Sequence, residues 1–70
     1  MTIKEIQRRV REIRASAKKN DYEQAHGLED SLYVDVLIAI KSKPHSQTWA
    51  ANAAIEALKT QKIDFERYTA

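Results

Sequence analysis

The sequence predicts an all-α fold, a small three-helix bundle with a C-terminal helical turn. Apolar side chains recur at steps of three and four residues in separate segments of the chain, which is the period of an α-helix packed on one side. Helix-capping patterns stand before these segments. The run at residues 33–40 has a strand-like composition, but no other segment offers it a partner strand, so it is also expected to be helical.

The first helix is expected from about Thr2 to Lys19. Thr2 and Glu5 form a capping box, in which the hydroxyl accepts from the Glu5 amide while the carboxylate reaches back. A narrow apolar seam then runs along one face of the helix: Ile3, Ile6, Val10, Ile13 and Ala17. The opposite face is basic and carries Lys4, Arg8, Arg11 and Lys18.

The second helix, residues 21–42, is expected to be the centre of the core. Asp21 and Gln24 form a weaker capping pattern at its start. One apolar stripe follows (Tyr22, Ala25, Leu28, Leu32, Val36 and Ala39), and a second one broadens it (Tyr33, Leu37 and Ile40). Gly27 costs about 1 kcal/mol against alanine inside a helix, which suggests the close approach of a neighbouring backbone. Asp35 is expected at the edge of the bundle; if it were buried, Lys41 or an arginine of the first helix could pair with it.

Pro44 ends the second helix, and Ser46 is the expected N-cap of a third helix that reaches about Thr60. The alanines of this third helix predict close packing against the second helix. Trp49 at its start is either a plug of the core or an exposed anchor for a partner. In the tail, Asp64 is expected to cap a single turn over residues 64–68 that folds Phe65 and Tyr68 over the open end of the core.

Size and composition favour one domain, residues 1–70, whose small core requires additional burial of apolar surface to be stable. Seventy residues support only a small core, and the absence of cysteine excludes disulfides and thiolate metal sites. Self-association as a homodimer is expected through a side of the second helix formed by Val34, Leu37, Ile38 and Ile40. The alternative is that the tail covers this side. The sequence has no apolar run long enough to predict a membrane span or a signal peptide, so a cytoplasmic protein is expected.

The charges of the first two helices are opposed. Residues 1–19 hold seven basic and two acidic side chains, whereas residues 20–40 hold five acidic side chains and no basic one. This distribution predicts that the two segments lie side by side, with charges meeting at the edges of the apolar seam.

A polar stripe on the second helix is the first candidate site: His26, Glu29, Asp30 and Tyr33 share one helix face. Three interpretations are open for it. It can be a structural edge where the second helix meets the first and Glu29 or Asp30 faces an arginine such as Arg9 or Arg14, a patch that recognises a partner protein, or a metal or acid–base site. One helix turn supplies few convergent ligands, and no phosphate loop or HExxH motif is present, so we expect no metal, no cofactor and no enzymatic activity.

The basic face of the first helix (Lys4, Arg8, Arg11 and Lys18) is the second candidate, since it can contact phosphates. A positive helix face is more often simply a solvated surface, and no aromatic side chain is interleaved with these bases. The third helix is poor in residues that read base edges, which argues against a sequence-specific DNA reader.

Two patterns resemble a group of short uncharacterised helical proteins encoded in bacterial and prophage genomes. The first is Ala25-His26-x-x-Glu29-Asp30-x-Leu32-Tyr33-x-Asp35-Val36-Leu37, and the second is Ala57-Leu58-Lys59-Thr60-x-x-Ile63-Asp64-Phe65-x-Arg67-Tyr68. The similar proteins often have tryptophan where this chain has Tyr68. The resemblance implies a compact, phage-associated helical protein and no catalytic role.

Together these observations lead to two functional expectations. The first is a small non-enzymatic protein-interaction module that binds and modulates a partner protein. The alternative is a nucleic-acid-binding accessory protein that uses the basic face of the first helix.

Overall fold

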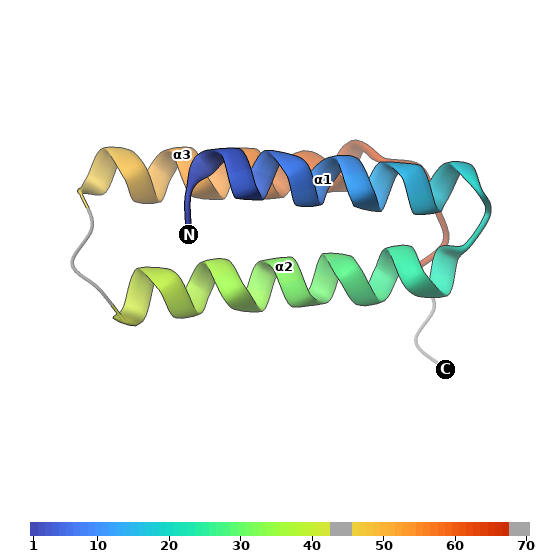
Figure 1. Ribbon diagram of the computed structural model, residues 1–70, viewed down its shortest axis with the longest axis horizontal. Coiled ribbons are helices and arrows are strands. Elements are labelled where there is room, and N and C mark those ends of the chain that lie inside the picture. Colours follow the sequence, from blue (N-terminus) through green and yellow to red (C-terminus); the bar gives the residue numbers. More distant parts are fainter. Residues whose placement is uncertain (43–45, 68–70) are drawn as a thin grey trace.

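The computed structural model describes residues 1–42 and 46–67, and it confirms the all-α three-helix bundle. Helix α1 spans Ile3–Lys18, α2 spans Tyr22–Ser42 and α3 spans Gln47–Leu58; a short 3₁₀ turn, η1, follows at Lys59–Lys62. Figure 1 shows that α1 and α2 run antiparallel and that α3 returns in the direction of α1. The predicted helix boundaries agree with these within two residues, and no strand occurs in the described part of the chain.

All three helices begin at a residue whose side chain caps the first turn. The Thr2 hydroxyl accepts from the Glu5 amide at 3.1 Å, and the Ser46 hydroxyl accepts from the Trp49 amide at 3.0 Å. Asp21 accepts from the Gln24 amide at 3.2 Å. The capping residues predicted from the sequence are therefore the ones that start the helices.

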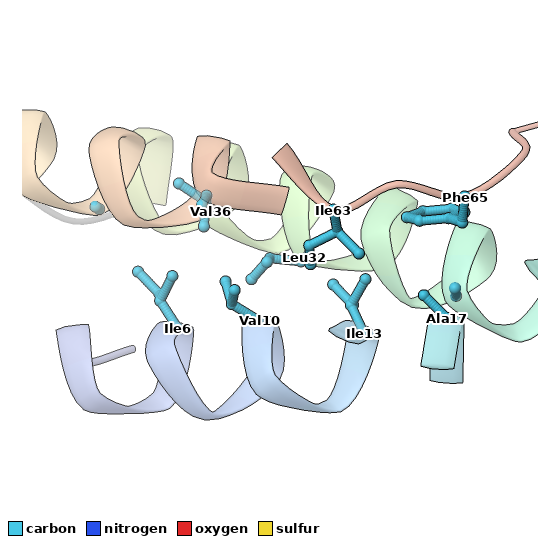
Figure 2. Close-up of a cluster of buried hydrophobic side chains, with 11 residues drawn as sticks. Ile6, Val10, Ile13, Ala17, Leu32, Val36, Ile63 and Phe65 are labelled. Carbon is cyan, nitrogen blue, oxygen red and sulfur yellow. The ribbon is translucent and has the colours of Figure 1, made fainter. Parts of the chain in front are cut away.

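The core is organised around α1, whereas the sequence analysis placed α2 in the middle. Both α2 and α3 pack on α1, and α2 and α3 pack less extensively on each other. Figure 2 shows Ile6, Val10 and Ile13 of α1 pointing toward α2 and the C-terminal segment. Ile6 and Ile13 are completely buried. The α1 seam takes this position because it is continuous, while the buried face of α2 is interrupted by Glu29.

The apolar run of α2 is mostly a surface feature, which corrects the expectation that it forms the centre of the core. Leu32 and Val36 are buried, but the side chains between and beyond them are exposed: Val34, Leu37, Ile38 and Ile40. Successive residues of a helix point about 100° apart, so a run that is apolar all round needs neighbours on every side. In this fold α1 covers one side of α2. Because α3 packs mainly on α1 and covers little of α2, part of the apolar run faces solvent.

Gly27 does not serve a close approach of helices. It is exposed, and a Cβ atom added at this position would meet nothing within 4 Å. The expectation of a neighbouring backbone at Gly27 was wrong.

The C-terminal segment closes one end of the core, but without the turn predicted at residues 64–68. The helical turn lies earlier, at η1, and residues 64–67 are not helical. Asp64 therefore caps no turn within this stretch. Ile63 and Phe65 are buried against the bundle, and the Phe65 ring lies 6.2 Å from the Tyr22 ring, centroid to centroid. Pro44 and Tyr68, for which roles were predicted, lie outside the described residues.

The opposed charges of the first two helices meet at one edge of the bundle. Arg9 of α1 donates to Asp35 of α2 at 2.7 Å, and the Asp35 side chain is half exposed. Asp35 thus lies at the edge, with an arginine of the first helix as its partner. Trp49 is half buried and packs against the core from the start of α3.

Candidate interaction surface

An apolar groove, called here the apolar groove, lies between α2 and α3. Its volume is about 320 Å³, and its walls come from Tyr33, Val36, Leu37, Ile40, Ala54, Ala57 and Leu58. The side chain of Leu37 is 65% exposed and that of Leu58 is 56% exposed, although both are large and apolar. Exposed apolar residues that gather in one place on a small protein are typical of binding surfaces.

The groove exists because of the way α3 packs. Ala53 and Ala57 let α3 lie close to the core, but Ala54 beside them is too short to reach the α2 side chains opposite. Since α3 packs more extensively on α1 than on α2, the side facing α2 is left open. The alanines were predicted to bring α3 close to α2, but α3 packs more extensively on α1.

Tyr33 forms a fixed wall at one end of this groove. Its hydroxyl is hydrogen-bonded to the hydroxyl of Thr60, which is completely buried, and it also accepts from the Gln61 side-chain amide at 2.9 Å. Both partners belong to η1, so the short turn after α3 holds the ring against α2. This wall is preorganised and does not have to be ordered when a ligand binds.

The polar stripe of α2 does not form one site, because its members have different partners. Glu29 is the most buried of them, with a side chain that is 3% exposed, and it binds Arg67. Glu29 does pair with an arginine, as expected, but the arginine is Arg67 of the C-terminal segment and not one of the first helix, and Arg9 pairs with Asp35 instead. Arg67 was part of a recognised sequence pattern, but its role could not be read from spacing along one helix.

Arg67 ties the C-terminal segment to α2 through several contacts. Its guanidinium donates to both carboxylate oxygens of Glu29, at 2.8 and 3.1 Å. It also donates to the backbone carbonyls of Thr60, Ile63 and Phe65, at 2.8, 3.1 and 3.2 Å respectively. The same group lies 3.8 Å from the centroid of the Phe65 ring.

The electrostatics of this pair follow from the geometry. The hydrogen bonds to Glu29 raise the pKa of Arg67 above its already high usual value, so the guanidinium stays charged at any ordinary pH. Both carboxylate oxygens of Glu29 accept hydrogen bonds from Arg67, and Arg67 is held in place by its bonds to three backbone carbonyls. Glu29 is therefore a structural residue.

His26 and Asp30 lie near each other on α2, but the His26 side chain is mostly buried, at 19% exposed, whereas Asp30 is exposed. His26 Nε2 lies 3.5 Å from Asp30 Oδ2, and the Asp30 side chain is 62% exposed. Within residues 1–42 and 46–67, no three His, Asp or Glu side chains gather closely enough to hold a metal ion.

The basic face of α1 is exposed at Lys4, Arg8, Arg11 and Lys18, and Arg8 is paired with Glu12 on the same helix. The fold adds further basic groups from η1 beside it. Arg14, Lys18 and Lys62 line a hollow of about 300 Å³ together with Asp64. This hollow could not be predicted from the sequence, because Lys62 is far from α1 along the chain.

Glu56 moderates the positive charge at the other end of this face. It binds the Lys59 ammonium at 2.9 Å and accepts from the Gln7 side-chain amide at 3.2 Å. These hydrogen bonds lower the pKa of the Glu56 carboxyl below its usual value. The carboxylate is thus the favoured form in the folded protein.

Comparison with known proteins adds no relative to this picture: no protein-family model, curated protein or solved structure matches the chain. Among the described residues, no helix combines the length and the apolar character that crossing a membrane requires.

Proposed function

We propose that the protein is a small non-enzymatic interaction module that binds and modulates a partner protein through the apolar groove. The observation that carries the proposal is the exposure of Leu37 and Leu58 on facing walls of one groove whose lining is almost entirely apolar. A cytoplasmic location and, from the sequence resemblance, a phage or prophage origin belong to the same proposal.

An amphipathic helix is the partner structure that suits the groove. The groove lies between two helices, and its lining residues repeat at steps of three and four along α2. Such a surface accepts the apolar side chains at positions i, i+3, i+4 and i+7 of a third helix. Apart from the Tyr33 hydroxyl, which is already bonded to η1, the lining side chains offer no polar group, so the affinity would come from apolar burial.

Substitution of Leu37 tests the proposal. Leu37→Lys places a charge in the groove, whereas Ile38→Lys makes a comparable change one position along, where the side chain is 48% exposed and borders a hollow on the α1 side of α2. The wild-type chain, immobilised and exposed to host lysate, should retain a protein that Leu37→Lys loses and Ile38→Lys keeps. Leu58→Lys, on the opposite wall, should lose the same protein.

A partner that binds all of these variants equally would contradict a role for the groove. Circular dichroism of each variant checks that it is folded, which is expected because the three replaced side chains are exposed.

Nucleic-acid binding is a second candidate, favoured by the hollow between α1 and η1. Arg14, Lys18 and Lys62 come together there from distant parts of the sequence, next to the basic face of α1. Binding to bulk RNA or DNA through this surface would weaken steeply with salt and in Arg14→Ala/Lys62→Ala, while Leu37→Lys would leave it unchanged. Absence of binding at low salt would contradict this candidate.

A further inference from the structure

The outer face of α2 carries a stripe with mirror-like spacing, called here the α2 stripe: Asp30, Val34, Leu37 and Lys41. Steps of four, three and four residues place these side chains along one line of the helix. The two apolar members are at the centre and the two charged members, of opposite sign, are at the ends. All four are exposed.

The spacing matters because it is symmetric about a point between residues 35 and 36. When two identical helices pair antiparallel around a two-fold axis through that point, residues equally distant from it lie opposite each other. Val34 of one copy then faces Leu37 of the other, and Asp30 faces Lys41. The Asp30–Lys41 contact occurs twice by symmetry, once at each end, and each time it joins an acid to a base.

From this arrangement we propose that the chain forms a homodimer in which the α2 stripes of two copies pack antiparallel, with Val34 and Leu37 at the centre and Asp30–Lys41 ion pairs at both ends. The inference does not depend on the proposed function, but Leu37 belongs to both the stripe and the groove, so the dimer contact and a bound partner helix would exclude each other at this side chain. A second copy is favoured over another occupant by this charge complementarity.

The side chains of the stripe are available for such a contact. Val34 is 52% exposed and Leu37 is 65% exposed. Among the described residues, Lys41 has no ion-pair partner, and the ion-pair partner of Asp30 is His26 on the same helix. Parallel pairing would place Asp30 against Asp30 and Lys41 against Lys41, which is unfavourable at both ends.

The α2 stripe alone is too small for a stable dimer, so the contact must extend beyond it. A specific interface covers about 800 Å² on each partner, more than four side chains supply. The apolar groove adjoins the stripe through Leu37, and Leu58 and Ile55 of α3 are 56% and 57% exposed beyond it. Antiparallel pairing of α2 therefore brings the α3 edge of each copy toward the partner and extends the apolar contact.

Charge reversal tests the register of the dimer. Sedimentation equilibrium of the full 70-residue chain, from micromolar to several hundred micromolar, should give the mass of two chains. Asp30→Lys and Lys41→Asp should each weaken the dimer by about ten-fold, because two-fold symmetry turns both ion pairs into repulsions at once. The double variant Asp30→Lys/Lys41→Asp restores opposite charges and should return to within a few-fold of the parent.

Two control reversals lie on exposed residues outside α2, at Glu66 and Lys4. Glu66→Lys and Lys4→Asp make matching changes of charge and should leave the dimer unaffected. The mass of one chain at every concentration, or a double variant no tighter than the single ones, would overturn the proposal. A monomer that still retains a Leu37-dependent partner would refute the dimer alone. Failure to retain a partner when the chain is immobilised at a density too low for dimers to form would refute the proposed function alone.

Discussion

Replacing Arg67 should destabilise the fold far more than its position near the C-terminus suggests. In Arg67→Met the carboxylate of Glu29 keeps its buried position but loses its cation. Breaking a buried ion pair in this way costs about 3–5 kcal/mol when both groups are buried. The Arg67 side chain is 28% exposed, so water can partly replace it, and we expect a cost of about 2–3 kcal/mol.

That cost is large for a domain of this size. A shift of about 1 kcal/mol corresponds to roughly 4–8 °C in melting temperature, so Arg67→Met should melt about 10–20 °C below the parent. Far-ultraviolet circular dichroism during heating measures the midpoint, and urea titration at constant temperature measures the free energy of unfolding. Glu66→Met, at an exposed neighbouring position, serves as the control and should change little.

The double variant Glu29→Met/Arg67→Met separates the ion pair from other effects. It removes both charges and leaves none buried alone, so it should recover at least half of the loss. Arg67→Lys should remain destabilised, because an ammonium cannot reproduce a bidentate contact together with three carbonyl bonds. A melting temperature for Arg67→Met within about 2 °C of the parent, or simply additive effects of the two methionines, would refute this reasoning.

Three further predictions concern single residues. Leu32 is completely buried, so Leu32→Ala should cost about 2–5 kcal/mol and leave the chain largely unfolded at room temperature in circular dichroism; an unchanged thermal midpoint would contradict its place in the core. Gly27→Ala should stabilise α2 by up to about 1 kcal/mol, because alanine has the higher helix propensity and the added methyl group meets no neighbour. A lowered melting temperature would contradict the open space around Gly27. Glu56→Gln should lower the melting temperature at neutral pH. The pKa of Glu56 is depressed in the folded state, so its contribution is present above the unfolded value and disappears as pH falls through the lower folded value. The difference from the parent should therefore vanish in strong acid, and a difference that persists there would show that it does not come from the charge.

The sequence by itself determined the helices. Their start points follow from the side chains of Thr2, Asp21 and Ser46, which cap the neighbouring turns, and such contacts depend on residues only three positions apart. The buried seam of α1 was equally readable, because a narrow apolar stripe with charges on the other faces has one way to pack. Local interactions and periodicity therefore gave the fold class.

The tertiary structure alone decided which helix is central and which apolar residues stay at the surface. The run from Leu32 to Ile40 is apolar on several faces, so its own pattern could not show which face would be covered. That depended on α3, which packs mainly on α1. The groove between α2 and α3, with Leu37 and Leu58 in its walls, therefore stays open. The partner of Glu29 was equally beyond local reading, since Arg67 is 38 residues away along the chain and reaches it only because η1 and the tail fold back over α2. Spacing along one helix determines which side chains share a face; only the packing of other segments determines what that face contacts.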